Sequence, residues 1–187
     1  TIMEQAHRCK EITQNLLNFA RQGDFQLVPS SVNSLLEKAI LLLEPDAKRS
    51  KVKIVTELDW TLPSVMTDPS QLQQVFLNVL KNALDASGPG SQVFVETASM
   101  SARRMIRVFF QDQGCGIPEE HVKSIFNPFF TTKPPGKGTG LGLSICHSIM
   151  SKLMGGIHLT STSGLGCTFV VDIPFTSPDI ERERNAS

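Results

Sequence analysis

Two asparagines one helical turn apart are the first residues whose spacing points to chemistry. Asn78 and Asn82 follow Gln74 at four-residue steps, so all three side chains share one face of a predicted helix. Asparagine is a poor helix former, which makes its repetition on one face notable. Amide oxygens are hard ligands, and Mg²⁺ typically takes one or two protein oxygens with water and substrate phosphates. A solvated polar face, bordered by Asp85, is the alternative interpretation.

An aspartate with two glycines behind it forms a second group. Asp112 follows a predicted strand, and alternation places it on the apolar side of that strand with Val108 and Phe110. A carboxylate at the edge of an apolar layer is costly unless it accepts hydrogen bonds, which an exocyclic amine such as adenine N6 would supply. Gly114 and Gly116 would let a flat ring lie against the backbone. A turn aspartate that bonds only its local backbone is the alternative.

Glycines at positions 138, 140 and 142 form a third group, directly after Lys137. The spacing is not that of a Walker loop, because Gly138 stands where Ser or Thr is required. It also fails the pattern G-x-G-x-x-G, because leucine or isoleucine occupies each third glycine position. A glycine-rich loop that runs into a helix presents unpaired N–H groups and partial positive charge, which favours a phosphate ligand. A flexible turn with close helix packing is the alternative.

The elements that must position these groups can be predicted from local signals. Asp68 and Pro69 are typical of a helix start, and that helix should run to about Ala86. A short helix should begin at Pro118 and end at Ile125. Two antiparallel hairpins are expected, because their connections are too short for a crossover. Their strands lie at residues 92–98 with 104–111 and at 157–162 with 167–173.

Amphipathic helices are expected at residues 1–22, after Ser30 or Ser31, and from Gly140 to about Met154. Hairpins with helices between them predict an α+β fold, a two-layer sandwich, with an additional N-terminal helix.

Composition narrows the class of protein. The 187 residues carry 18 Lys and Arg against 18 Asp and Glu, so the net charge is zero, which argues against a nucleic-acid protein driven by bulk charge. A local basic patch is the alternative that this count leaves open. The four cysteines form no C-x-x-C pair, which favours buried thiols in a reducing compartment. The longest clean apolar run, residues 39–43, is far too short for a membrane span. The chain begins with Thr1 rather than methionine, and we expect it to be a fragment.

The groups occur in an order that resembles the catalytic and ATP-binding domain of bacterial sensor histidine kinases, the Bergerat ATP-binding fold. The matching stretches are Asn78-x-x-x-Asn82-Ala, Asp112-x-Gly-x-Gly, Phe126-x-Pro-Phe-Phe, Gly138-Thr-Gly-Leu-Gly-Leu and the last glycine box, Gly164-Leu-Gly-Cys-Thr-Phe169. The likeness implies three parts. Residues 1–23 would be the second helix of a dimerisation and histidine-phosphotransfer hairpin, 24–176 the catalytic domain and 177–187 a disordered tail.

The resemblance also implies roles for single residues. Asn82 would bind Mg²⁺, Asn78 would contact phosphate or support the metal, and Lys137 would join them as a catalytic residue. Asp112 would bind adenine N6. The implied ATP contacts comprise Asn78, Asn82, Asp85, Asp112, Gly114, Gly116, Ile117, Phe126, Lys133, Lys137, Gly138, Thr139, Gly140, Leu141, Gly142, Leu143 and Thr168.

Two departures from the family pattern refine the expected activity. Gln74 stands where the related gyrase, MutL and chaperone ATPases carry a water-activating glutamate, which favours phosphoryl transfer over hydrolysis. The helix with the phosphoacceptor histidine is missing, since His7 is followed by Arg8 and lies on the wrong helix. We therefore expect this fragment not to autophosphorylate alone.

In the intact protein, the resemblance implies transfer of the γ-phosphoryl group of ATP to a histidine on a helix of the same or the partner subunit. An aspartate of a response-regulator receiver domain would accept it next. The whole kinase would be a homodimer, either cytoplasmic or the cytoplasmic portion of a membrane-bound bacterial sensor. The alternatives are an ATP-hydrolysing switch of the same fold, a serine or mitochondrial-type kinase, and a non-catalytic scaffold that signals by helix pairing.

Overall fold

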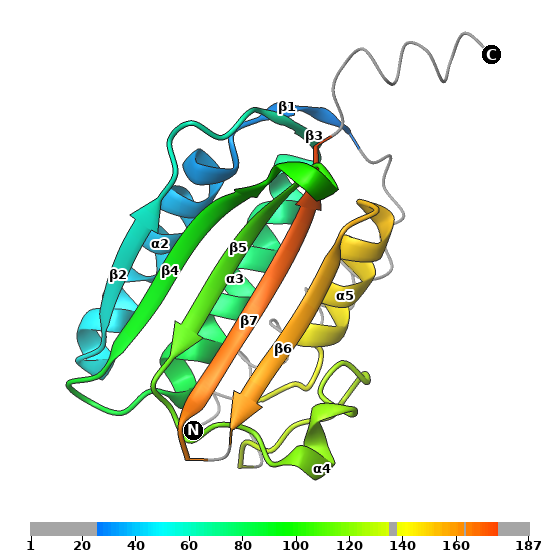
Figure 1. Ribbon diagram of the computed structural model, residues 1–187. Helices are drawn as coiled ribbons and strands as arrows, with labels where there is room; N and C mark the ends of the chain where they lie inside the picture. The colour runs from blue at the N-terminus through cyan, green and yellow to red at the C-terminus, as the bar shows by residue number, and fades with distance from the viewer. Residues whose placement is uncertain (1–25, 135–137, 163, 176–187) are drawn as a thin grey trace, which may run out of the picture.

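A five-stranded mixed sheet packs against a layer of helices in the computed structural model, which describes residues 26–134, 138–162 and 164–175 (Figure 1). The sheet order is β2-β4-β5-β7-β6. Its strands are β2 (Lys53–Leu58), β4 (Gln92–Met100), β5 (Met105–Asp112), β6 (Gly156–Thr162) and β7 (Gly166–Pro174). Helices α2 (Val32–Ser50), α3 (Pro69–Ala86) and α5 (Gly142–Lys152) cover one face and lie behind the sheet in Figure 1. The predicted two-layer α+β sandwich is confirmed.

Helix α3 is the central helix of its layer and packs against both α2 and α5. Asp68 caps it, because the carboxylate Oδ1 accepts the backbone N–H groups of Ser70 at 3.0 Å and Gln71 at 3.1 Å. Its apolar stripe is fully buried against the sheet, where the Phe76 ring lies 6.0 Å from that of Phe110 on β5. The opposite, polar stripe of the same helix remains partly accessible.

Strand pairing confirms both predicted hairpins, since β4 pairs antiparallel with β5 and β6 with β7. The pairing of β2 with β4 was not predicted and is parallel. The chain between them contains β3 (Val65–Thr67) and α3, which supply the long crossover that a parallel pair needs. Strand β1 (Val28–Ser30) pairs with β3 in a separate two-stranded sheet.

Two helix boundaries differ from the predictions. Helix α4 (Glu119–Val122) ends before Ile125, and turns follow it. Helix α5 begins two residues after Gly140, because that glycine has φ +67° and so lies outside the right-handed helical region. The predicted helix over residues 1–22 and the tail from residue 177 lie outside the described residues.

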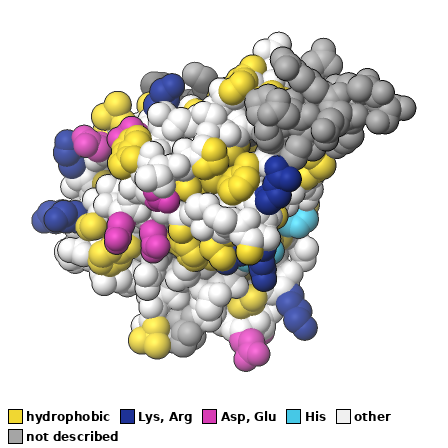
Figure 2. Space-filling view, turned by 45° about the horizontal axis from the view of Figure 1, so that its top comes forward, with side chains coloured by type: hydrophobic (Ala, Val, Ile, Leu, Met, Phe, Trp, Pro, Cys, Tyr) yellow, Lys and Arg dark blue, Asp and Glu magenta, His cyan; other side chains and the backbone are white. Residues whose placement is uncertain are grey.

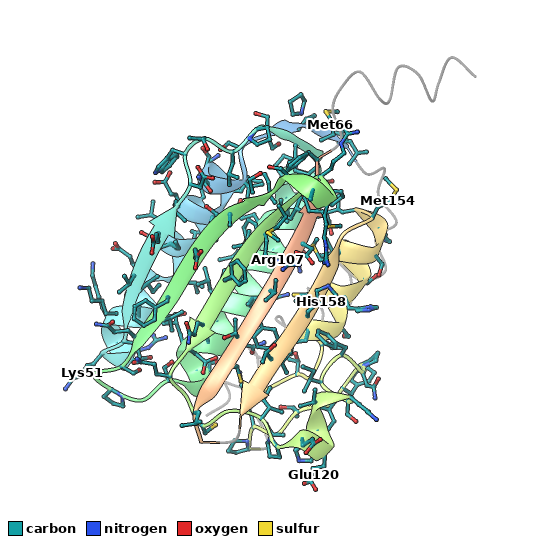
Figure 3. All side chains as sticks on the ribbon, in the orientation of Figure 1. Lys51, Met66, Arg107, Glu120, Met154 and His158 are labelled. Atoms are coloured by element: carbon teal, nitrogen blue, oxygen red, sulfur yellow. The ribbon has the colours of Figure 1, made fainter. Side chains whose placement is uncertain are left out.

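The second face of the sheet carries a polar cluster. Arg107 on β5 and His158 on β6 lie on this face (Figure 3). Buried Asp172 on β7 accepts from Arg107 Nε at 2.7 Å and Nη2 at 3.0 Å, and its Oδ2 lies 3.4 Å from His158 Nε2.

On the side shown in Figure 2, basic, acidic and apolar side chains are interspersed.

The cysteines are partly as expected. Cys146 and Cys167 are buried free thiols, whereas Cys115 is a free thiol exposed in the loop after β5, so the prediction of burial is wrong for it. Cys9 lies outside the described residues. Of the helices that the structure describes, none is long and apolar enough to cross a membrane.

Candidate active site

The polar stripe of α3 brings the predicted groups together. Asn78 Nδ2 donates to the carbonyl oxygen of Gly142, at the start of α5, over 3.3 Å. One turn later, Asn82 Oδ1 accepts from Lys133 Nζ at 3.2 Å. The same ammonium group lies 2.8 Å from Asp85 Oδ2. The stripe therefore contacts both the start of α5 and the loop before it.

Asp112 ends β5 with its side chain turned toward the helix layer and only 3% exposed. Its Oδ1 accepts two backbone N–H groups, from Gly114 at 2.9 Å and from Cys167 at 3.2 Å. Burial raises the pKa of the Asp112 carboxyl, and the two backbone hydrogen bonds act in the opposite direction. Both bonds fall on Oδ1, so Oδ2 can accept a hydrogen from a ligand.

The loop after Asp112 abuts the end of α3. A Cβ placed on Gly114 would lie 2.5 Å from the Ala86 carbonyl oxygen and 2.8 Å from Asp112 Oδ1, a spacing that only glycine permits. Further along, Gly116 has φ +68° and Ile117 N–H donates to Ser161 Oγ at 2.8 Å. The loop after Asp112 therefore packs against Ala86, which lies one turn beyond Asn82 on α3.

The start of α5 is suited to an anion. Leu141 occupies the N-cap position with no side-chain cap, and its own N–H points to Thr139 Oγ1 at 3.4 Å. Uncapped N–H groups at a helix start carry partial positive charge. Gly142 brings this backbone against Asn78, with 3.8 Å between a notional Cβ and the amide carbon Cγ. The Leu143 side chain is partly buried and packs against the hydrophobic core.

Aromatic residues form the base of the loop between α4 and α5, which lies at the end of the sheet where β5 finishes (Figure 1). The Phe126 ring lies 5.7 Å from that of His147 on α5, and Phe130 meets His121 edge-on at 5.4 Å. A further hydrogen bond, from Phe129 N–H to the Gly140 carbonyl at 2.9 Å, closes the loop base.

Of the predicted residues, Thr168 is turned away from this site, and Lys137 cannot be compared with it. Thr168 pairs with Gln111, so alternation turns its side chain to the sheet face opposite Asp112. Lys137 lies outside the described residues. The residue that meets Asp112 is Cys167, which the sequence reasoning missed. The contact is made by its backbone N–H, which no pattern of side chains in the sequence indicates.

The β6–β7 hairpin holds the Asp112 loop in place. Gly164 N–H donates to the Cys115 carbonyl at 2.7 Å, and Ser161 Oγ, the acceptor for Ile117, lies 3.1 Å from Cys167 Sγ. Gly166, with φ +94°, approaches so closely that a Cβ would lie 2.1 Å from the Asp112 carbonyl oxygen. The last hairpin of the domain therefore shapes the site.

Gly166→Ala is expected to destabilise the domain more than Gly164→Ala. Both glycines have positive φ, which costs an alanine about 1–2 kcal/mol. A Cβ at Gly164 meets nothing within 4 Å, whereas at Gly166 it collides with backbone, which adds about 1–3 kcal/mol. Urea denaturation would measure the difference in the free energy of unfolding, and equal losses for the two variants would contradict the close approach.

Comparison with known proteins agrees with this geometry. The two-layer sandwich has a buried carboxylate at the end of β5 and amide side chains on the adjoining helix α3, an arrangement compatible with an ATP-using catalytic domain. Residues 67–177 match the family described as histidine kinase-, DNA gyrase B-, and HSP90-like ATPase, and the chain belongs to this family.

Individual relatives place it among the histidine kinases. It is 33% identical to the signal transduction histidine-protein kinase AtoS of Escherichia coli K12, over 92% of this chain and 28% of AtoS. The catalytic domain of histidine kinase ThkA superposes with a TM-score of 0.72 at 32% identity, over 82% of this chain and 97% of that one. ThkA in complex with response regulator TrrA matches at 27% identity and TM-score 0.77, covering 94% of this chain and 49% of that one. The chain carries the ATPase/kinase domain of a sensor histidine kinase, and spans about a quarter of the length of AtoS.

Proposed function

We propose that this site binds ATP with Mg²⁺ and that the domain transfers the γ-phosphoryl group to a histidine on a phosphotransfer helix. The observation that carries the proposal is that three groups lie along the C-terminal half of α3. They are the amide oxygen of Asn82, the uncapped start of α5 and the buried carboxylate of Asp112. A metal-bound triphosphate and a purine need these three kinds of partner.

Asn82 is the proposed Mg²⁺ ligand. Its Oδ1 and the Asp85 carboxylate already share the Lys133 ammonium group, so this end of α3 favours a cation. The amide oxygen of Asn82 is a hard donor of the kind that Mg²⁺ prefers. When bound, the ion would neutralise phosphate charge and orient the terminal group. Asn78, tied to Gly142, would support that side of the site.

The adenine is proposed to lie against the loop after β5. Asp112 Oδ2 would accept the N6 amine while Oδ1 stays bonded to its two backbone donors. Gly114 and Gly116 would leave room for the ring, with Ile117 and Phe126 beside it. Purine binding and loop geometry would then depend on the same carboxylate.

The phosphates are proposed to face the start of α5 and the loop before it. The backbone from Gly138 through Leu143 would supply N–H groups, with Thr139, Gly140 and Leu141 in this run. Transfer would form a phosphorus–nitrogen bond to imidazole and break the bond between the γ-phosphorus and the β,γ-bridging oxygen of ATP, which leaves on ADP, while the imidazole releases a proton to solvent. Such transfer depends mainly on positioning and charge neutralisation. Gln74 on the same stripe cannot serve as a base for water, which supports transfer rather than hydrolysis.

The partners follow from the same proposal. The phosphoacceptor helix would belong to the same subunit or to the second subunit of a homodimer, and residues 1–23 would form the adjoining hairpin helix. A response-regulator receiver domain would take the phosphoryl group, as the complex of ThkA with TrrA suggests for that relative. Because its substrate is cellular ATP, we place the domain in the cytoplasm.

The 187-residue chain is expected to bind ATP without labelling itself. Incubation with γ-labelled ATP should give no acid-labile, alkali-stable phosphate on histidine, because the phosphoacceptor helix is not in this sequence. Adding a separate polypeptide with that helix, taken from the intact kinase, should restore the label. Self-labelling on histidine would contradict the assignment, and steady phosphate release would favour an ATP-hydrolysing switch instead.

A further inference from the structure

Lys133 turns inward between two exposed neighbours. Thr132 and Pro134 are exposed, yet the Lys133 side chain keeps only 33% of its surface accessible. Its ammonium group lies 2.8 Å from Asp85 Oδ2 and 3.2 Å from Asn82 Oδ1. The Lys133 ammonium group therefore contacts both the Asp85 carboxylate and the Asn82 amide oxygen, and the latter is the proposed ligand of Mg²⁺.

The backbone around Lys133 supports this inward position. Its N–H donates to Thr131 Oγ1 at 3.1 Å. A Cβ at Gly138 would lie 3.3 Å from both Cβ and Cδ of Lys133, so the glycine backbone lies against the aliphatic stem. The backbone at Gly138, which precedes α5, thus packs against the Lys133 side chain and directs it toward α3.

An ammonium group and a Mg²⁺ ion cannot share one amide oxygen, because like charges at that separation repel strongly. We propose that Asp85 retains Lys133 on Asn82, so that Mg²⁺–nucleotide binds by displacing the lysine. This inference rests on the proposed function and adds a regulatory role for Asp85. The displaced Lys133 would be free to approach the phosphates.

Asp85 has a second cation that makes the exchange feasible. Lys81 Nζ lies 3.9 Å from Asp85 Oδ1 and 2.9 Å from Asp46 Oδ2. When Lys133 leaves, Asp85 keeps this neighbour and is not left as an isolated carboxylate. The exchange therefore gives up one partly exposed ion pair, and the small free energy of such a pair can be offset by the binding of Mg²⁺.

Asp85→Asn tests the exchange, with Mg²⁺ titrated at fixed ADP and ADP binding measured by calorimetry. The variant should lower the Mg²⁺ concentration for half-maximal ADP binding about two- to fivefold, the range that a partly exposed ion pair gives. Glu44→Gln removes one negative charge from the neighbouring helix α2, where Glu44 pairs with Lys48 rather than with Lys81 or Lys133, and should leave the midpoint unchanged. In a Lys133→Gln background, Asp85→Asn should have no further effect.

Several outcomes would overturn the exchange while leaving the proposed function intact. A higher Mg²⁺ midpoint for Asp85→Asn would make Asp85 a supporter of the metal. An equal fall with Glu44→Gln, or in the Lys133→Gln background, would reduce the effect to general surface charge. Failure of the wild-type chain to bind ADP at any Mg²⁺ concentration would instead reject the proposed function.

Discussion

Asn82→Ala is expected to weaken the binding of Mg²⁺–ADP about 100-fold, since even residues that only support metal ligands contribute about 10–100-fold. The amide oxygen is the proposed direct ligand, whereas Lys133 keeps its 2.8 Å contact with Asp85 in the variant. Asn82 is partly exposed on α3, so alanine, a good helix former, should not unfold the domain. Calorimetric titration of the 187-residue chain with ADP, in the presence of Mg²⁺ and then of EDTA, would measure the effect.

The two conditions separate a metal contact from a general loss of binding. In EDTA, wild type and Asn82→Ala should bind ADP with similar, weak affinity, because the lost interaction involves the ion. Gln73→Ala, on the same helix but one residue off the polar stripe, is the matched control and should behave as wild type. An Asn82→Ala variant with unchanged Mg²⁺-dependent affinity would reject Asn82 as the ligand.

Asp112→Asn is expected to weaken ATP binding about 10- to 100-fold, because hydrogen bonds to charged groups contribute about 1.5–3 kcal/mol. The asparagine oxygen can still accept the N–H groups of Gly114 and Cys167, so the loop should keep its conformation. The other side-chain atom changes from an acceptor to an NH₂ donor and would face the N6 amine of adenine, donor against donor. Competition with a fluorescent ATP analogue would measure the loss.

The nucleobase offers an internal control for this variant. Guanine carries a carbonyl where adenine carries N6, so GTP should not lose affinity and the preference for ATP over GTP should fall. Asp59→Asn changes a carboxylate that follows β2, and its N–H bonds Thr97, four residues along β4 from the partner of Asp112, so the preference should be unaltered. Parallel losses of ATP and GTP in Asp112→Asn would mean that the residue only supports the loop.

Local signals predicted the parts of the fold that depend on neighbouring residues. Asp68 and Pro69 placed the start of α3 correctly because an N-cap is decided within one turn. The alternation that put Asp112 on the buried side of β5 was likewise confirmed. The parallel pairing of β2 with β4 escaped prediction, because its partner is selected by packing across the whole sheet.

The site shows the same division between local and distant causes. Four-residue spacing placed Asn78 and Asn82 on one face, but it could not decide where a long side chain such as Lys133 points. That choice depends on Asp85 and on the glycine backbone packed against the stem. Thr168 and its neighbour Cys167 lie on opposite faces of β7, because a step of one residue along a strand exchanges the two faces.

The position of β7 within the sheet has a consequence for how the protein is made. This strand is the last one in the part of the chain that the structure describes, yet it lies between β5 and β6 and donates the Cys167 N–H to Asp112, 55 residues upstream. A chain emerging from the ribosome would carry both asparagines and Asp112 well before this donor appears. Nucleotide should therefore not protect nascent chains that end before β7. Nucleotide binding would instead report completion of the whole domain.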